Sequence, residues 1–312
     1  MTKKKRLISI AIPVKNESSN LQLLYGALNR LADSRPKYHF EFVFTDNHSE
    51  DSSWEDLRSL SQIDPRVRGV RFSKDFGFQN SILENYRICR GDAVIQLDAD
   101  LQDPPEIIGL FLDNWEKGYH VVYGVRLRPE ESFILRKFRD LGYLVINLLS
   151  ESRIPKGAGD FRLLDRKVVT ALLQQKHSKP YLRGIVAGMG FNQLGLEYER
   201  RSRKYGESKF PAKKLLILGL NGIINHSTIP LRLATYAGGA LLILSSLAAI
   251  YSVSSFLLSD NLPRGFTSLQ LVQFLTIGIN SFFLGIIGEY VLRIYRIVRR
   301  DPQVIVEDSF NS

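Results

Sequence analysis

The sequence predicts an α/β protein in which a mostly parallel, doubly wound sheet is followed by two membrane-spanning helices. Two observations predict this class. Short apolar, β-branched runs alternate with polar segments of helical length through the first part of the chain. Farther on, the 56 residues from Leu233 to Gly288 contain only two charged residues, Asp260 and Arg264, although 24% of the 312-residue chain is charged. The chain therefore joins a soluble part to a membrane part.

The overall composition excludes several classes of protein. With 44% hydrophobic residues the chain is neither intrinsically disordered nor a fibrous repeat. The single cysteine, Cys89, excludes an internal disulfide and a paired-thiolate metal site, and we interpret it as a small buried residue. The net charge of +10 does not indicate nucleic-acid binding, because no basic strip with interleaved aromatics occurs and many cations flank the apolar segments. Anionic lipid is the better partner.

Five strands are predicted in the soluble part, with helices between the first four and before the fifth. The strands cover residues 8–12, 40–44, 67–72, 93–97 and 121–123. The first helix runs from Ser18 or Ser19 to residue 31, the second from Ser49 or Ser52 to residue 60, the third over 79–89 and the fourth over 104–115. Serine can cap a helix, and proline is tolerated in a first turn. Ligands of such sheets bind at the carboxyl ends of the strands.

The membrane part is predicted as a hairpin of two helices, at about 233–258 and 266–290. Each run exceeds the roughly 20 apolar residues that cross a bilayer. Lysines and arginines precede the first run and follow the second, whereas the connector carries only Arg264, so both termini are expected on the cytoplasmic side. Two amphipathic stretches, about 132–150 and 210–228, fit helices that lie in the membrane interface, with packing against the sheet as the alternative. The predicted organisation is thus a soluble domain over 1–209, an interfacial helix over 210–228, two spans within 229–296 and a tail over 297–312.

Polar residues follow the first three predicted strands. Asn16 and Glu17 come after Pro13, Asp46 and Asn47 end the second strand, and Lys74, Gly77 and Gln79 follow the third. Carboxylates and amides at strand ends can accept hydrogen bonds from a base or a ribose, and glycine permits close approach to the backbone. The alternative for Asp46 is a local turn with Ser49 that only caps a helix.

The fourth strand ends in an acidic turn that predicts a metal site. Asp98 and Asp100 are separated by one residue, and Gln102 adds an amide oxygen. Such hard oxygen ligands can converge on Mg²⁺ or Mn²⁺ and leave positions for substrate phosphates. Simple turn propensity of aspartate is the alternative, but it explains the residue type and not its place after a buried strand.

These segments together resemble the family 2 glycosyltransferases of GT-A fold, in particular the group that uses polyisoprenyl phosphates and contains dolichol-phosphate mannose synthases and bactoprenol glucosyltransferases. The resemblance covers nearly the whole chain. It departs from the family at Asn47-His48, where the second-strand element commonly has Asp-Gly. The motifs that carry it are Pro13-Val14-Lys15-Asn16-Glu17, Asp46 with Ser49, Lys74-Asp75-Phe76-Gly77, Asp98 to Pro105, Gly124-Val125-Arg126, Gly159-Asp160-Phe161-Arg162-Leu163 and Arg203 to Lys209.

The resemblance implies an inverting transfer of a hexose from a nucleotide diphosphate to a polyprenyl phosphate, undecaprenyl phosphate in bacteria, at the cytoplasmic face of the plasma membrane. UDP-glucose is the first choice of donor, with GDP-mannose or another nucleotide-sugar as alternatives. A processive polysaccharide synthase is disfavoured because no tryptophan follows Arg183, and a membrane-tethered nucleotide-sugar sensor is the non-enzymatic alternative. The number of subunits stays open, a homo-oligomer included.

The same resemblance assigns roles to residues. Asp160 and Arg126 are the expected catalytic residues, and Asp160 either orients the acceptor or removes its proton. Because a phosphate monoester is already anionic at neutral pH, it needs little help from a base. Arginine binds phosphate oxygens in pairs, which favours a cationic acceptor site. The expected ligands of the acceptor phosphate are Arg126, Arg136, Arg139, Arg203 and Lys209. The expected donor-binding residues are Pro13, Asn16, Glu17, Asp46, Asn47, Lys74, Gly77, Gln79 and Asp98, and the expected metal ligands are Asp98, Asp100 and Gln102.

Overall fold

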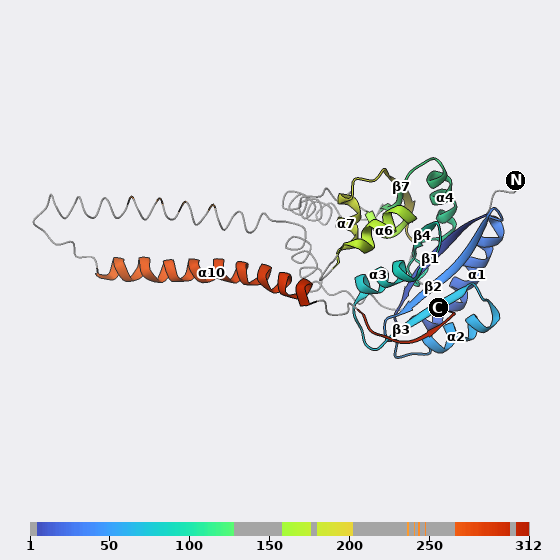
Figure 1. Cartoon of the computed structure of the whole chain (residues 1–312), viewed down its shortest axis with the longest axis horizontal. Helices are drawn as coiled ribbons and strands as arrows, with labels where there is room; N and C mark the ends of the chain where they lie inside the picture. Colours follow the sequence, from blue (N-terminus) through green and yellow to red (C-terminus); the bar gives the residue numbers. More distant parts are fainter. Residues whose placement is uncertain are drawn as a thin grey trace, which may run out of the picture. The chain divides into compact units, whose positions relative to one another are not determined.

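The computed structural model describes residues 5–127, 158–175, 180–201, 266–299 and 304–311, with four separate helical positions at 236, 240, 243 and 247 (Figure 1). The chain divides into two compact units. One comprises Met1–His226 with Pro302–Ser312 and contains the sheet, and the other comprises Ser227–Asp301. Each unit is described by itself below.

The first unit is built on an eight-stranded sheet in the order β7-β5-β6-β4-β1-β2-β3-β8. Its strands are β1 (Arg6–Val14), β2 (Tyr38–Asp46), β3 (Val67–Phe72), β4 (Ala93–Gln96), β5 (Val121–Leu127), β6 (Ala158–Asp165), β7 (Gln193–Glu199) and β8 (Val306–Phe310). The five predicted strands are therefore confirmed as β1 to β5. β1 pairs in parallel with β2 and β4, and β2 pairs in parallel with β3, so their carboxyl ends lie at one edge.

The sheet is mixed rather than mostly parallel, which corrects the prediction. β6 runs antiparallel to both β4 and β5, and β8 runs antiparallel to β3, whereas β7 is parallel to β5. The prediction of a mostly parallel sheet rested on strands that alternate with helices. This alternation holds for β1 to β5 but not for β6, which pairs antiparallel with both of its neighbours. Residues 306–310, which had been assigned to a tail, form β8 at the edge of the sheet.

The four predicted helices are confirmed within a few residues. They are α1 (Ser18–Ser34), α2 (Ser53–Ile63), α3 (Phe78–Ile88) and α4 (Ile108–Glu116), the last preceded by the short 3₁₀ helix η1 (Pro105–Ile107). Two further helices are α6 (Arg166–Gln174) and α7 (Leu182–Gly188). Of the two proposed caps of α2, Ser52 precedes the helix but makes no capping hydrogen bond with its side chain.

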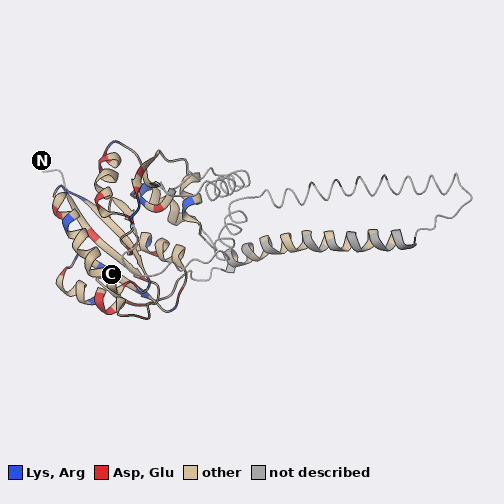
Figure 2. Cartoon of the chain, turned by 180° about the vertical axis from the view of Figure 1, so that it is seen from behind, with Lys and Arg blue, Asp and Glu red and all other residues tan. Residues whose placement is uncertain are grey.

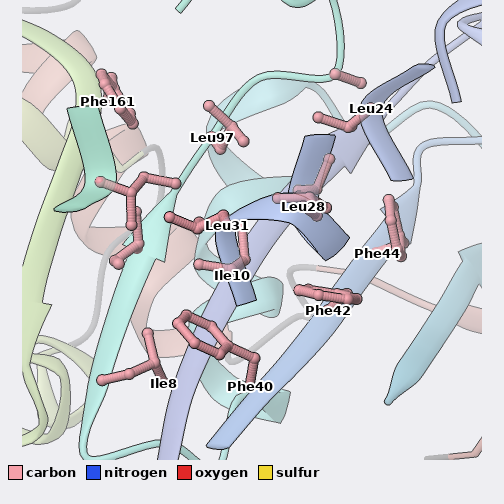
Figure 3. Close-up of a cluster of buried hydrophobic side chains, with 14 of the residues drawn as sticks. Ile8, Ile10, Leu24, Leu28, Leu31, Phe40, Phe42, Phe44, Leu97 and Phe161 are labelled. Carbon is pink, nitrogen blue, oxygen red and sulfur yellow. The ribbon is translucent and has the colours of Figure 1, made fainter. Parts of the chain in front are cut away.

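Helices cover both faces of the sheet, so the doubly wound arrangement holds. Alternate residues of the central strands point to opposite faces, as the two-residue period of a strand requires. Ile10 and Phe42 pack with α1, α2 and α4 in one core, part of which Figure 3 shows. Ala11 and Val43 pack with α3, α6 and α7 in the other. Two buried cores hold the strands rigidly, and the loops at their carboxyl ends are therefore well placed relative to one another.

The second unit is described mainly by α10 (Phe266–Arg299), a helix of 34 residues. Leu269, Ile277 and Leu284 on this helix are exposed. Within the part of the chain that the structure describes, no helix reaches the length and hydropathy needed to cross a membrane. The predicted second span, 266–290, coincides with α10. The predicted span 233–258, apart from four positions, and the interfacial helices at 132–150 and 210–228 lie outside the described residues.

Candidate active site

The loop after β1 is hydrogen-bonded to the loop after β2. Asn16 adopts a left-handed backbone with φ 54°. Its amide donates to Ser49 Oγ at 2.9 Å, and its Oδ1 accepts from the amide of Glu50 at 2.8 Å. The Glu17 amide donates to Ser53 Oγ at 3.0 Å. Asparagine tolerates the left-handed region because its side chain can make such local hydrogen bonds. Two predicted donor-binding residues, Asn16 and Glu17, thus lie beside Asp46 at the end of β2.

Asp46 is fully buried where β2 ends. Its carboxylate accepts from the Ser49 amide at 3.2 Å and also from the Ser49 hydroxyl, and Arg71 Nε lies 3.6 Å away. Burial raises the pKa of Asp46 above its ordinary value, although the Ser49 hydrogen bonds and the Arg71 charge oppose that shift. The local turn with Ser49 that the sequence allowed is therefore present.

Asn47 connects the loop after β2 to the loop after β3. Its Nδ2 donates to Asp75 Oδ1 at 2.6 Å, and its Oδ1 accepts from the Phe76 amide at 2.9 Å. Asp75 also pairs with Lys15 Nζ at 2.5 Å, which brings in the loop after β1. Burial would raise the pKa of Asp75, but the hydrogen bonds from Lys15, the Gly77 amide and Asn47 outweigh it and lower the pKa. An amide suits position 47 because it donates to Asp75 and accepts from Phe76 at the same time, whereas an ionised carboxylate could only accept.

The other residues predicted after β3 lie in the loop that leads into α3 or in the first turn of that helix. Gly77 has φ 87° and precedes the helix, a conformation that favours glycine. Gln79 Oε1 accepts from the backbone amide of Leu182 at 3.0 Å and so connects α3 to α7. Lys74 is exposed, with Nζ 5.2 Å from the centre of the Phe76 ring.

An acidic turn follows β4, as predicted. Asp100 is 7% exposed, and its Oδ1 accepts from the Gln102 amide at 3.2 Å. Leu101, between them, has a left-handed backbone with φ 58°. Burial raises the pKa of Asp98 to about 7, and the negative charges of Asp103, Asp100 and Asp160 add to that effect. Several carboxylates are therefore close enough to repel one another, an arrangement that a bound cation relieves.

Asp103 ties this turn to β5 and β7. It is fully buried and accepts a hydrogen bond from the Tyr198 hydroxyl at 2.5 Å. Arg126 Nη2 lies 3.2 Å from Asp103 Oδ2, and Arg200 Nε lies 3.3 Å from Asp103 Oδ1. Arg126 Nε also donates to the Tyr198 hydroxyl at 3.2 Å. Arg126 therefore has a fixed position, with 15% of its side chain exposed.

Asp160 lies on β6 and is 4% exposed. Arg183 on α7 donates two hydrogen bonds to its carboxylate, from Nε at 2.9 Å and from Nη2 at 2.6 Å. Arg162 Nη2 lies 3.7 Å from Asp160 Oδ1. Burial would raise the pKa of Asp160, but the charges of Arg183, Arg162 and Arg126 outweigh it and keep the pKa below its usual value. Asp160 is therefore ionised at neutral pH.

The structure brings together much of the predicted site. Pro13, Asn16, Glu17, Asp46 and Asn47 lie at the carboxyl ends of β1 and β2, and Asp98 interacts electrostatically with Asp100, Asp160 and Arg126. Four expected phosphate ligands lie outside the described residues: Arg136, Arg139, Arg203 and Lys209. In Figure 2 the ribbon of the sheet-containing unit carries both red acidic and blue basic positions.

Sequence motifs assign no role to five residues that organise these loops: Asp75, Asp103, Arg183, Tyr198 and Arg71. Asp75 and Asp103 were inside recognised motifs but were given no role. Arg183 was considered only for the tryptophan missing after it. For Tyr198, which follows no motif, the sequence contains no signal.

The metal prediction concerns two carboxylates and one amide. Among the described residues, no group of three or more His, Cys, Asp or Glu side chains is arranged to hold a metal ion. Asp98 and Asp100 nevertheless fit a divalent cation in chemistry, because both supply oxygen ligands and the negative charges of Asp103 and Asp160 act on Asp98 as well.

Comparison with known sequences decides the family. Residues 9–173 match the glycosyl transferase family 2. The chain belongs to glycosyltransferase family 2. An uncharacterized glycosyltransferase of Bacillus subtilis is 39% identical over 97% of this chain and 94% of its own length. The bactoprenol glucosyl transferase derived from the SfII prophage of Shigella flexneri is 32% identical over 97% of this chain and 98% of its own.

A solved structure confirms the fold of this family 2 chain. Glucosyl-3-phosphoglycerate synthase of Mycobacterium tuberculosis, in complex with Mn²⁺, UDP and glucosyl-3-phosphoglycerate, superposes with a TM-score of 0.51 at 16% identity. The match covers 70% of this chain and 78% of the synthase. At that identity the likeness concerns the fold alone. The expected GT-A architecture is thus shown for the sheet-containing unit.

Proposed function

We propose that this glycosyltransferase is a membrane-bound, metal-dependent, inverting enzyme that transfers glucose from UDP-glucose to a polyprenyl phosphate at the cytoplasmic face of the plasma membrane. The observation that carries the proposal is the similarity, over 97% of the chain, to proteins named bactoprenol glucosyl transferase. The strand-end geometry supports it, because the loops after β1, β2 and β3 are bonded to one another at the edge of the sheet where β4 also ends.

The donor nucleotide would lie over the loops after β1, β2 and β3. Asp46 is held by Ser49 and Arg71, and Asn47 is held by Asp75 and Phe76. Such prior ordering lowers the entropy cost of binding. The other donor-binding residues in this proposal are Pro13, Asn16, Glu17, Lys74, Gly77, Gln79 and Asp98.

Asp98, Asp100 and Gln102 would hold a Mg²⁺ or Mn²⁺ ion. When bound there, the ion would stabilise the negative charge that develops on the departing nucleotide diphosphate. The Mn²⁺ and UDP bound together by the distant synthase are consistent with this pairing. The carboxylates of this chain provide the charge, and the fixed turn after β4 provides the position.

The acceptor phosphate would be attracted by arginines and oriented near Asp160. Asp160 is ionised and already bonded to Arg183, so it is a poor proton acceptor and acts in this proposal by orientation. An anionic phosphate monoester can attack without a strong base. Arg126 would contact the phosphate from the position that Asp103 and Tyr198 fix. Arg136, Arg139, Arg203 and Lys209 complete the proposed acceptor site.

The membrane placement has its own support. The uncharged runs on either side of Arg264, the cationic residues that flank them and the exposed apolar side chains of α10 all fit a chain that meets lipid. A lipid-phosphate acceptor requires that placement.

A donor panel tests the proposal directly. The full-length protein in membranes would be incubated with undecaprenyl phosphate and radiolabelled UDP-glucose, GDP-mannose or UDP-N-acetylglucosamine, with and without EDTA. We expect label from UDP-glucose in the chloroform-extractable fraction, and loss of that label with EDTA. Absence of transfer from every donor would refute the enzyme and favour a nucleotide-sugar sensor, whereas a long polymeric product would favour a processive synthase.

A further inference from the structure

Strand β8 pairs with the last residues of β3 and with the loop that follows. Phe72 lies opposite Val306 in the antiparallel register. One residue farther, the Ser73 amide donates to the Ile305 carbonyl at 3.0 Å. Backbone pairing with β8 therefore extends to the first residue of the loop over 73–77, which carries Asp75 and Gly77.

Side chains fix β8 in this register. The Phe310 ring covers Gly69 so closely that a Cβ there would lie 2.4 Å from it. The same ring lies 4.9 Å from the Trp54 ring, centre to centre. Trp54 Nε1 donates to Asp308 Oδ2 at 3.2 Å, and Arg58 pairs with the same carboxylate. β8 is therefore an integral strand of the sheet.

Arg71, at the end of β3, lies between the loop after β2 and β8. Its Nη2 donates to the Ser49 carbonyl at 3.1 Å, and its Nε lies 3.6 Å from Asp46 Oδ2. On the β8 side, Arg71 Nε lies 3.7 Å from Glu307 Oε2, and Glu307 also lies 4.0 Å from His48 Nδ1. The guanidinium of Arg71 thus lies between Asp46, a residue proposed to bind the donor nucleotide, and Glu307 of β8.

We propose that β8 is a positioning element of the donor-nucleotide site and that Arg71 and Glu307 are positioning residues. β8 holds the start of the loop over 73–77 and, through Arg71, the turn at Asp46. The inference rests on the proposed function, which places the nucleotide over these loops. It adds to that function a requirement for residues 305–310, which are far away in sequence from the loops they order.

The effect is expected in donor binding rather than in turnover. Loops that are already ordered bind a ligand at lower entropy cost. The acidic turn follows β4, which is separated from β3 by β1 and β2 in the sheet. Loosening β8 therefore leaves the proposed reaction centre in place once the donor is saturating.

Full-length variants of the protein test the proposal. Glu307→Gln removes the charge beside Arg71, and Phe310→Ala removes the ring that packs on Gly69 and Trp54. Glu116→Gln is the matched control, because Glu116 is similarly exposed, 40% against 52% for Glu307, and pairs with Lys37 near the amino end of β2. Affinity for UDP-glucose would be measured by calorimetry, KM and kcat by transfer, and amide protection of residues 71–77 by hydrogen exchange.

For Glu307→Gln we expect the donor Kd and KM to rise about two- to fivefold, the range of an exposed ion pair. For Phe310→Ala we expect the donor Kd and KM to rise about tenfold, while kcat stays within about twofold of the parent. Amide exchange over residues 71–77 should become faster. Glu307→Asp should keep most of the parent's affinity for UDP-glucose. Glu116→Gln should leave the donor Kd, KM, kcat and amide exchange as they are in the parent.

Parental donor affinity in Glu307→Gln, together with unchanged amide protection over 71–77 in Phe310→Ala, would overturn the proposal. If Phe310→Ala does not fold, the Kd of Glu307→Gln alone decides. If the parent protein binds no nucleotide-sugar, the proposed function fails, and with it the role in donor binding. In that case the exchange measurement still shows whether β8 orders the loop.

Discussion

The carboxylate of Asp160 on β6 accepts two hydrogen bonds from the guanidinium of Arg183 on α7, at 2.9 and 2.6 Å. Such a paired, charge-assisted geometry stabilises the ionised carboxylate more than a single hydrogen bond does. It also occupies the oxygens that would otherwise accept a proton. Asp160 is therefore better suited to orient an acceptor than to deprotonate it.

The first prediction follows from this pair. Arg183→Met should lower kcat by about tenfold or more, because the carboxylate of Asp160 loses its two hydrogen bonds from Arg183 and then moves or takes up a proton. Arg183→Lys should recover part of the activity, since it restores the charge but not the paired geometry. The measurement is the rate of transfer between about pH 5 and 8, where Asp160 of the parent should stay ionised, so that its titration does not change the rate. A parental rate in Arg183→Met would contradict the assignment.

A second prediction concerns Asn47, where the sequence departs from its family. Asn47→Asp should raise the donor KM about threefold to tenfold, because aspartate cannot donate to Asp75 and two carboxylates would then face each other. Donor affinity and amide exchange over 75–77 would be measured, with Asn114→Asp on α4 as a control. Unchanged donor affinity and amide exchange in Asn47→Asp would show that the Asn47–Asp75 hydrogen bond does not order residues 75–77.

The parts of the fold that depend on local pattern were predictable from the sequence. β1 to β4 are buried apolar runs that end at polar loops, and α1 to α4 begin and end within a few residues of their predicted bounds. β6, β7 and β8 were not predicted, because their direction and partners depend on pairing with strands distant in sequence. β8 in particular is a polar-looking segment that becomes a strand only through Phe310, Asp308 and the edge of β3.

The residues of the candidate site were predictable where they belong to short sequence motifs. Asp98, Asp100 and Asp46 belong to short motifs that follow strands, so their location was foreseeable. Arg183, Tyr198 and Arg71 act through partners more than 20 positions away, and no local spacing indicates such contacts. Sequence therefore located the polar groups but not the network that fixes them.

A third prediction tests the acidic turn. Asp100→Asn should abolish the transfer that depends on Mg²⁺ or Mn²⁺ while the protein still inserts into membranes, because the amide is a weaker ligand for a hard cation. Activity would be titrated against each metal after chelation. The control is Asp113→Asn, because Asp113 lies on α4 and pairs with Arg35. Parental activity of Asp100→Asn at saturating Mg²⁺ would reject the ligand assignment.

Tyr198→Phe provides a fourth prediction, on stability. The hydroxyl donates to buried Asp103 and accepts from Arg126, so its loss should destabilise the fold by about 1–3 kcal/mol. The thermal midpoint would fall, and Arg126 would lose its hydrogen bond to the Tyr198 hydroxyl. Tyr25→Phe, which removes a hydroxyl bonded to Asp64, is the matched control for stability. Only Tyr198→Phe should also raise the KM for the lipid acceptor. An unchanged acceptor KM would argue against a phosphate contact by Arg126.

The last prediction is a dependence of stability on pH, set by Asp64 and Arg66. Burial would raise the pKa of Asp64, but the hydrogen bonds from Arg66 outweigh it, so the folded-state pKa is lowered. A lowered carboxyl pKa means that the pair stabilises the fold above the unfolded pKa of about 3.9 and that this contribution is lost as pH falls through the folded pKa.

Arg66→Met should therefore lower the free energy of unfolding by about 1 kcal/mol at pH 6 to 7, a value discounted for the partly exposed guanidinium. The difference in thermal midpoint between the parent and Arg66→Met should shrink below about pH 4. Asp64→Asn should show the same loss at neutral pH, and the double variant should add little to it, since both changes break one pair. A midpoint difference that stays constant from pH 7 to 3 would mean that Arg66 stabilises the fold by packing rather than through the charge of Asp64.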